Sequence, residues 1–155
     1  MTPQEAFIKA TKVRAKAYFY IFDEFRKELG EQKAKEIFSR AIYRLGEDNS
    51  SKYSEAAKQS PKELGKEFCA DAVGREVFNK KVIGANDKHV QLEMKSCPLV
   101  QTWQEMGLSK QEIKTMCDIA YNVDFGTMES LGYKLSFPSR LACEQDSCIL
   151  EIVTI

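Results

Sequence analysis

The chain has 155 residues, of which 43% are hydrophobic and 30% are charged, a composition typical of a globular protein. Basic and acidic residues number 23 each, so the overall charge gives no reason to expect a nucleic acid or an anionic membrane as a partner. The sequence shows no signal peptide and no apolar stretch of the roughly 20 residues that a membrane helix needs. We therefore expect a cytoplasmic protein.

Capping sequences mark the starts of three predicted helices. Residues 2–5 (TPQE), 60–63 (SPKE) and 109–112 (SKQE) place a serine or threonine three positions before a glutamate, which allows reciprocal hydrogen bonds with the backbone. Glycines mark two helix ends, at Gly30 and Gly46. The four longer predicted helices cover residues 3–29, 31–45, 61–79 and 110–121.

Alternating polar and apolar residues predict three strands in the second half of the chain. They cover residues 89–95, 133–137 and 149–153, and the polar turn at 144–147 allows the last two strands to form a hairpin. A shorter helix is expected at 99–106, and either a short helix or an ordered loop at 122–131.

The predicted fold class is α+β, with a helical N-terminal half packed on a small antiparallel sheet with inserted helices. We expect a single domain over residues 1–155. Within it, residues 1–80 form a helical scaffold part and residues 85–155 form a cysteine-bearing α+β part.

Cysteines are the most informative residues, because four of the five lie in the last 60 positions. Thiols stay reduced in the cytoplasm, and an odd number of cysteines argues against a complete set of internal disulfides. We therefore expect cysteines that are free, metal-bound or catalytic. Cys69, on the third predicted helix, is expected to lie in the core.

Cys97 stands directly before Pro98, where a predicted strand gives way to a helix. At a helix N-terminus the positive dipole and free amides lower the pKa of a thiol. Cys97 is therefore a candidate nucleophile or metal-bound thiolate. Equally, it can be a buried side chain that fills the corner between strand and helix.

Two acids are candidates for proton transfer. Asp118 follows Cys117 on a predicted helix, and Asp124 lies just beyond the end of that helix. Cys117 continues an apolar helix face, so core packing explains it as well as function does. Each acid can also be an ordinary solvated side chain.

The remaining candidate residues carry weaker signals. Cys143 and Cys148 are separated by four residues, a spacing that permits a shared metal ion but completes no recognised zinc or iron–sulfur motif. His89, the only histidine, is expected to be exposed at a strand start. Trp103 is expected to be a core or pocket-wall residue.

The order of these residues resembles one family, the L-2-amino-thiazoline-4-carboxylic acid hydrolase-like proteins, over about residues 85–155. In that family a cysteine after a strand, a helical cysteine with a nearby aspartate, and a cysteine opening the last strand recur. The resemblance extends to 4-vinyl reductase domains, small α+β modules that bind ligands or sense redox state. The residues that carry it are Cys97-Pro98, Trp103, Gly107, Cys117-Asp118, Asp124, Glu144-Gln145-Asp146 and Cys148.

The resemblance implies a hydrolase that opens a small cyclic amidine or thioimidate. Cys97 is then the nucleophile or a ligand of a metal that activates water, Cys117 and Cys148 complete the site, and Asp118 or Asp124 handles the proton. In the metal version, Cys97, Cys117 and Cys148 hold zinc or iron.

Two alternatives stay open. The same three-cysteine pocket can belong to a non-catalytic domain that binds a metal, an Fe–S centre or a small ligand, or that senses redox state. A structural or oligomerising domain is the third interpretation, favoured if the first helix leaves a large apolar stripe exposed. We expect a small-molecule substrate or ligand as partner, with a homo-oligomer possible.

Overall fold

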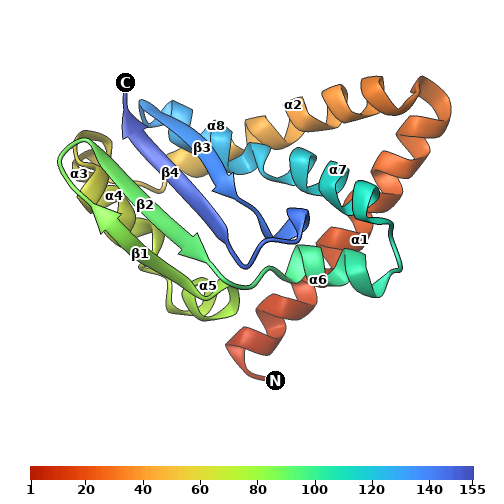
Figure 1. Cartoon of the computed structure of the whole chain (residues 1–155), viewed down its shortest axis with the longest axis horizontal. Helices are drawn as coiled ribbons and strands as arrows, with labels where there is room; N and C mark the ends of the chain where they lie inside the picture. The colour runs from red at the N-terminus through yellow and green to blue at the C-terminus, as the bar shows by residue number, and fades with distance from the viewer.

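A computed structural model describes all residues, 1–155, and confirms the α+β fold class (Figure 1). Eight α-helices, one 3-10 helix and four strands follow one another along the chain. The helices are α1 (Pro3–Leu29), α2 (Glu31–Ser50), α3 (Glu55–Gln59), α4 (Pro61–Phe68), α5 (Ala72–Phe78), α6 (Pro98–Glu105), α7 (Lys110–Ala120), α8 (Asn122–Ser130) and η1 (Leu141–Cys143). The strands are β1 (Lys80–Ala85), β2 (His89–Met94), β3 (Tyr133–Ser139) and β4 (Cys148–Thr154).

The predicted helix starts are correct, and their caps explain them. Thr2 and Ser109 each accept a hydrogen bond from a backbone amide three residues on, and Glu5 and Glu112 bond back to complete both capping boxes. Ser60 caps α4 in the same way through the amide of Glu63. These caps satisfy backbone groups that would otherwise lack partners at each helix start.

The predicted end of α2 at Gly46 is wrong, because the helix continues through Gly46 to Ser50. Gly46 is instead a crossing point between α2 and α8. A Cβ atom built on Gly46 would lie 2.9 Å from the Cα of Gly126, and one built on Gly126 would collide with the backbone of Tyr43. The two glycines therefore allow the helix backbones to touch.

The predicted helix at 61–79 is also wrong, because it breaks into α4 and α5. Asp71 accepts a hydrogen bond from the amide of Gly74 and so starts a new helix within the predicted one. Arg75 donates to the carbonyl of Cys69, which the break leaves without a helical partner. Asn79 then turns the chain with a left-handed φ of 48° into β1, a strand that the sequence analysis missed.

The four strands form an antiparallel sheet in the order β1-β2-β4-β3. The predicted strands β2, β3 and β4 are confirmed, and β3 pairs with β4 as expected. One face carries the buried residues of β2 and β4 and is covered by helices, with α4 against β2 and α8 against β3 (Figure 1). The other face carries residues such as His89 and Glu151, which are diagonal neighbours on β2 and β4, with His89 Nε2 3.6 Å from Glu151 Oε1.

Two clusters of buried side chains make up the core. The first joins α1, α2, α6 and α7 around Trp103 and Phe22, and the second joins α3, α4 and α8 to the covered face of the sheet around Leu92 and Tyr133. Trp103 is fully buried, and its indole N–H donates to the carbonyl of Ala15 at 2.9 Å. Both clusters combine residues from the two halves of the sequence.

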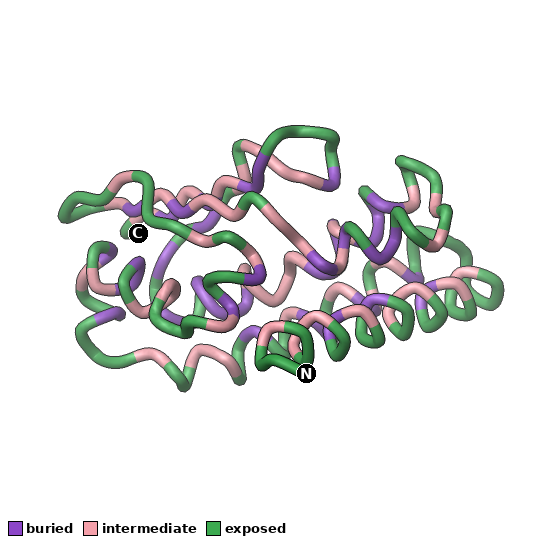
Figure 2. The backbone as a smooth tube through the Cα atoms, turned by 90° about the horizontal axis from the view of Figure 1, so that it is seen from below, coloured by how far each residue is buried: buried purple, intermediate pink, exposed green.

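Helix α1 is largely exposed. Figure 2 shows it along one side of the molecule, and only Thr11, Ala15 and Phe22 are buried on it. Several large apolar side chains of α1 face outward, since Ile21 is 45% exposed and Leu29 50%. None of the helices is both long enough and apolar enough to cross a bilayer.

Candidate functional site

A cavity of about 180 Å³ lies where the two core clusters meet. Thirteen of its sixteen lining residues are hydrophobic, and the other three are Arg14, Lys80 and Asp124. The lining residues are Arg14, Phe68, Phe78, Lys80, Met94, Cys97, Leu99, Val100, Trp103, Cys117, Ala120, Tyr121, Val123, Asp124, Phe137 and Cys148. Mostly apolar hollows with a few polar groups are typical of small-molecule sites.

The topology of the sheet brings Cys97 and Cys148 to the same end of it. Met94, at the end of β2, pairs with Cys148 at the start of β4, and Cys97 follows three residues after Met94. Cys117 joins them from α7, so all three cysteines line the cavity. All five cysteines of the chain are free thiols.

Cys97 is the N-cap residue of α6, and Pro98 occupies the first helical position as expected. The predicted low thiol pKa is not found. Burial raises the pKa of Cys97 to about 12, and the backbone amides of Val100 and Leu99 only partly offset that effect. The cavity around the sulfur is too apolar for the helix N-terminus to stabilise a thiolate in the free protein.

The other two cavity thiols are also protonated at neutral pH. Burial raises the pKa of Cys117 to about 11, although the guanidinium of Arg140 opposes this. Burial also raises the pKa of Cys148, whose sulfur accepts a hydrogen bond from the amide of Leu141 at 3.3 Å.

No group of three or more His, Cys, Asp or Glu side chains is placed to hold a metal ion. The metal ligand set predicted at Cys97, Cys117 and Cys148 therefore gains no support from the geometry, and it stays a prediction.

Asp118 does not line the cavity, and three cations surround it instead. Its carboxylate lies 2.7 Å from Arg140, 2.9 Å from Lys35 and 3.0 Å from Lys114. Burial would raise the pKa of Asp118, but the hydrogen bonds from these cations outweigh burial and hold the pKa below its usual value. The residue is an ion-pair centre that connects α2, α7 and the segment after β3.

Asp124 does line the cavity, from the first turn of α8. Burial raises its pKa to about 6, and the positive charge of Lys80 only partly opposes the shift. Near neutral pH this carboxyl can therefore both give and take a proton, as general acid–base catalysis requires. Of the two predicted proton carriers, Asp124 is the one beside the cavity thiols.

Three other candidates lie outside the cavity. His89 is on the solvent-facing side of the sheet, where its side chain is 29% exposed beside Glu151. Cys143 is exposed in η1. Cys69 packs against the second core cluster, as expected.

Sequence reasoning missed two basic residues of the cavity, Arg14 and Lys80. Arg14 is an exposed residue of α1, so the cavity reaches the surface beside this helix. Nothing in the sequence shows that Lys80, and not its neighbour Lys81, lines the cavity. Only the strand that the sequence analysis missed explains why Lys80 faces inward.

Cys97 and Val100 border a second hollow as well as the cavity. Both also line a groove on the outer surface, together with Ser96, Gln101 and Gln104. At this point the wall between the cavity and the surface is therefore made by these two side chains.

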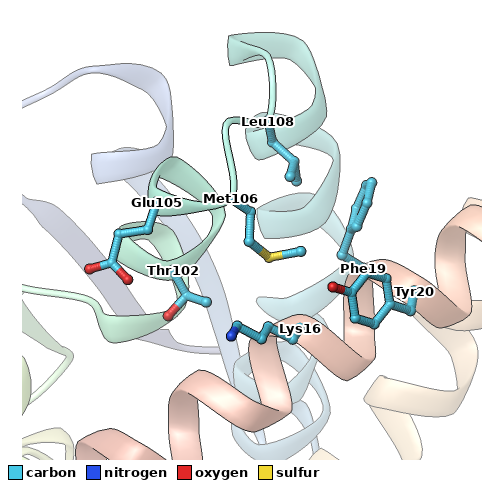
Figure 3. Close-up of a pocket in the computed structure, with 7 residues that line it drawn as sticks. All are labelled: Lys16, Phe19, Tyr20, Thr102, Glu105, Met106 and Leu108. Atoms are coloured by element: carbon cyan, nitrogen blue, oxygen red, sulfur yellow. The ribbon is translucent and has the colours of Figure 1, made fainter.

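A separate hollow lies between α1 and α6 (Figure 3). It is lined by Lys16, Phe19, Tyr20, Thr102, Glu105, Met106 and Leu108. It contains no cysteine or histidine, and its only acid, Glu105, is engaged by Lys12 at 3.2 Å. The cavity is the better candidate because it combines thiols with an acid of shifted pKa.

The sequence profile of the L-2-amino-thiazoline-4-carboxylic acid hydrolase family matches residues 10–151. The chain belongs to this family. The resemblance seen in the cysteine-bearing part is thus confirmed, and membership of the L-2-amino-thiazoline-4-carboxylic acid hydrolase family extends through the helical half. No curated protein matches the chain.

Two solved structures have a similar fold. A trafficking protein particle complex subunit 3 from Naegleria fowleri, covalently bound to palmitic acid, superposes with a TM-score of 0.62 at 12% identity, over 93% of this chain and 94% of that one. The phenol-responsive sensory domain of the transcription activator PoxR, with phenol, superposes with a TM-score of 0.57 at 12% identity. The match covers 90% of this chain and 74% of that one. At such identity the likeness concerns the fold alone.

Proposed function

We propose that the cavity is the active site of a small-molecule hydrolase that opens a cyclic amidine or thioimidate ring of the 2-amino-thiazoline-4-carboxylate type. Family membership supports the hydrolase class. The observation that carries the assignment to this site is the presence of the Cys97 thiol and the Asp124 carboxyl in one mostly apolar cavity. Apolar surroundings strengthen polar interactions at such a site.

Cys97 makes the first bond. Its sulfur bonds to the ring carbon between nitrogen and sulfur, and the thiol proton goes to the ring nitrogen, so no free thiolate is needed at the thiol's pKa of about 12. The bond between this carbon and the ring sulfur then breaks. The departing sulfur takes a proton from the neutral form of Asp124.

Water completes the reaction. The carbon is now an isothiouronium cation on Cys97, and the Asp124 carboxylate balances its charge. Water adds to the carbon and gives one proton to Asp124. The second proton returns to the sulfur of Cys97 as the carbon–sulfur bond breaks, which releases a ureido product that carries a free thiol.

Replacement of Cys97 by serine tests the proposal. We expect Cys97→Ser to reduce the rate of ring opening of 2-amino-thiazoline-4-carboxylate by about a hundredfold or more, because the first covalent bond depends on this sulfur. The measurement is the appearance of the product thiol over time. Cys143→Ser is the matched control, since Cys143 is exposed and outside the cavity, and it should leave the rate unchanged. Full activity in the Cys97→Ser protein would refute the assignment.

A second candidate function is the binding of a small ligand without catalysis. The predominantly hydrophobic lining favours it, and the two proteins of similar fold hold palmitic acid and phenol. A wild-type protein that binds small cyclic compounds in the cavity but never opens their rings would support this function over the hydrolase.

A further inference from the structure

Lys80 and Lys81 on β1 point to opposite faces of the sheet. Lys81 pairs with Glu93 in the strand register, and its Nζ lies 3.4 Å from Glu93 Oε1 on the outer face. Lys80 pairs with Met94, and both residues line the cavity on the helix-covered face. Successive side chains of a strand alternate between faces, so the chain places one lysine outside and one inside.

No acidic side chain forms an ion pair with Lys80, which is half-buried. The Nζ of Lys80 lies 4.4 Å from the ring centre of Phe68 and 5.5 Å from that of Phe78. These cation–π contacts hold the ammonium group in place, but they do not neutralise its charge. Partial removal of a cation from water is unfavourable, and the nearby charges of Asp124 and Asp71 offset only part of that cost. An anion that enters the cavity would relieve more of it.

The charges that line the cavity favour an anion. Arg14 and Lys80 contribute two positive charges, and Asp124 is the only acid. Burial also lowers the pKa of Lys80, with the charge of Asp124 only partly opposing it. A nearby ligand carboxylate would therefore favour the charged form of the lysine.

The size of the cavity restricts the rest of the ligand. Its volume of about 180 Å³ is close to the roughly 150 Å³ of an engineered apolar protein cavity that binds benzene. One ring with a small substituent fits this space. The aromatic wall of Phe68, Phe78, Tyr121 and Phe137 suits a flat ring.

We infer that Lys80 binds the carboxylate group of the ligand while the ligand's ring lies against the aromatic wall. This inference rests on the proposed function, whose substrate type is a single-ring carboxylate, and it adds the residue that recognises the carboxylate. Lys80 thus determines specificity for acids, and it takes no part in the bond-making steps at Cys97.

Trp103 makes the inference measurable, because it is the only tryptophan and it lines the cavity. Titration of its fluorescence at pH 7.5 with benzoate and with benzamide, the uncharged analogue of similar shape, compares an anion with a neutral ligand. We expect benzoate to bind the wild-type protein about tenfold or more tightly than benzamide. Lys80→Met should remove this preference, and Lys81→Met should keep it.

A conservative variant distinguishes the loss of the positive charge from the loss of folding. Lys80→Arg keeps the charge and should retain the preference for benzoate, while circular dichroism checks that each variant is folded. Equal binding of benzoate and benzamide to the wild type, a preference that survives in Lys80→Met, or no response to benzoate would each overturn the inference. Benzoate has no ring that hydrolysis can open, so these results are independent of whether Cys97 is a nucleophile.

Discussion

Asp124 and Cys97 show at the residue scale how burial sets the chemistry of the cavity. Both groups become charged when they lose a proton, and the apolar surroundings disfavour that charge. The pKa of Asp124 therefore rises to about 6 and that of Cys97 to about 12. The same burial makes the carboxyl a useful acid near neutral pH and makes the thiol a poor nucleophile until a substrate accepts its proton.

The shifted pKa of Asp124 predicts how its contribution to stability depends on pH. The folded protein holds this proton more tightly than the unfolded chain, whose aspartate has a pKa near 3.8. The stabilisation is therefore fully present below about pH 4, is lost as the pH rises to about 6, and amounts to about 3 kcal/mol. As the pH rises from about 4 to about 6, we therefore expect the free energy of unfolding of the wild type to fall by up to about 3 kcal/mol relative to that of Asp124→Asn.

Denaturant unfolding of both proteins at several pH values measures this difference. Asp118→Asn serves as the opposite control, because the lowered pKa of Asp118 stabilises the fold at high pH and loses its effect as the pH falls. A difference between wild type and Asp124→Asn that stays flat from pH 4 to pH 6.5 would contradict the burial of this carboxyl.

Single residues were predictable from the sequence where the local context decides their role. The proline after Cys97 placed that thiol at a helix start, and the resemblance singled out Asp124. The pKa of Cys97 was not predictable, because it depends on how apolar the surrounding side chains are, and these come from distant segments. The inward position of the Lys80 side chain was not predictable for the same reason, because it depends on how β1 pairs with β2.

At the scale of elements, the crossing of α2 and α8 depends on two glycines. We expect Gly126→Ala to destabilise the protein by about 3 kcal/mol or more, because the added methyl group meets the backbone of Tyr43 and backbone atoms cannot move aside as a flexible side chain can. Gly84→Ala is the control, since a Cβ atom there meets nothing within 4 Å. Thermal unfolding of the two variants checks this, and equal melting temperatures would contradict the close crossing.

The elements show where local sequence signals suffice and where they fail. Caps fixed the helix starts, because the hydrogen bonds involved lie within four residues. Gly46 was misread because a glycine required for a helix crossing looks the same in sequence as a glycine that ends a helix. The strand β1 was missed because Lys80-Lys81 hides its alternation, and only pairing with β2 reveals it.

At the scale of the whole molecule, Asp118 joins parts of the chain that are far apart in sequence. It pairs with Lys35 of α2, Lys114 of α7 and Arg140 near the end of β3. We expect Asp118→Ala to cost about 3–5 kcal/mol of stability, because it leaves the largely buried Arg140 without its counter-charge. Lys114→Ala, which removes a half-exposed partner, should cost only about 1 kcal/mol or less.

Urea unfolding of both variants near pH 7 measures these costs. A loss for Asp118→Ala no larger than that for Lys114→Ala would show that the ion-pair centre contributes little. The resemblance to the hydrolase family singled out Asp118, yet the sequence could not show its three ion-pair partners together, because they lie 83, 4 and 22 positions away.

The wall at Cys97 has a consequence for the space on its two sides. Because Cys97 and Val100 line both the cavity and the outer groove, a change in the size of either side chain alters both hollows. A substitution at either position therefore cannot reshape the interior without also reshaping the outer surface.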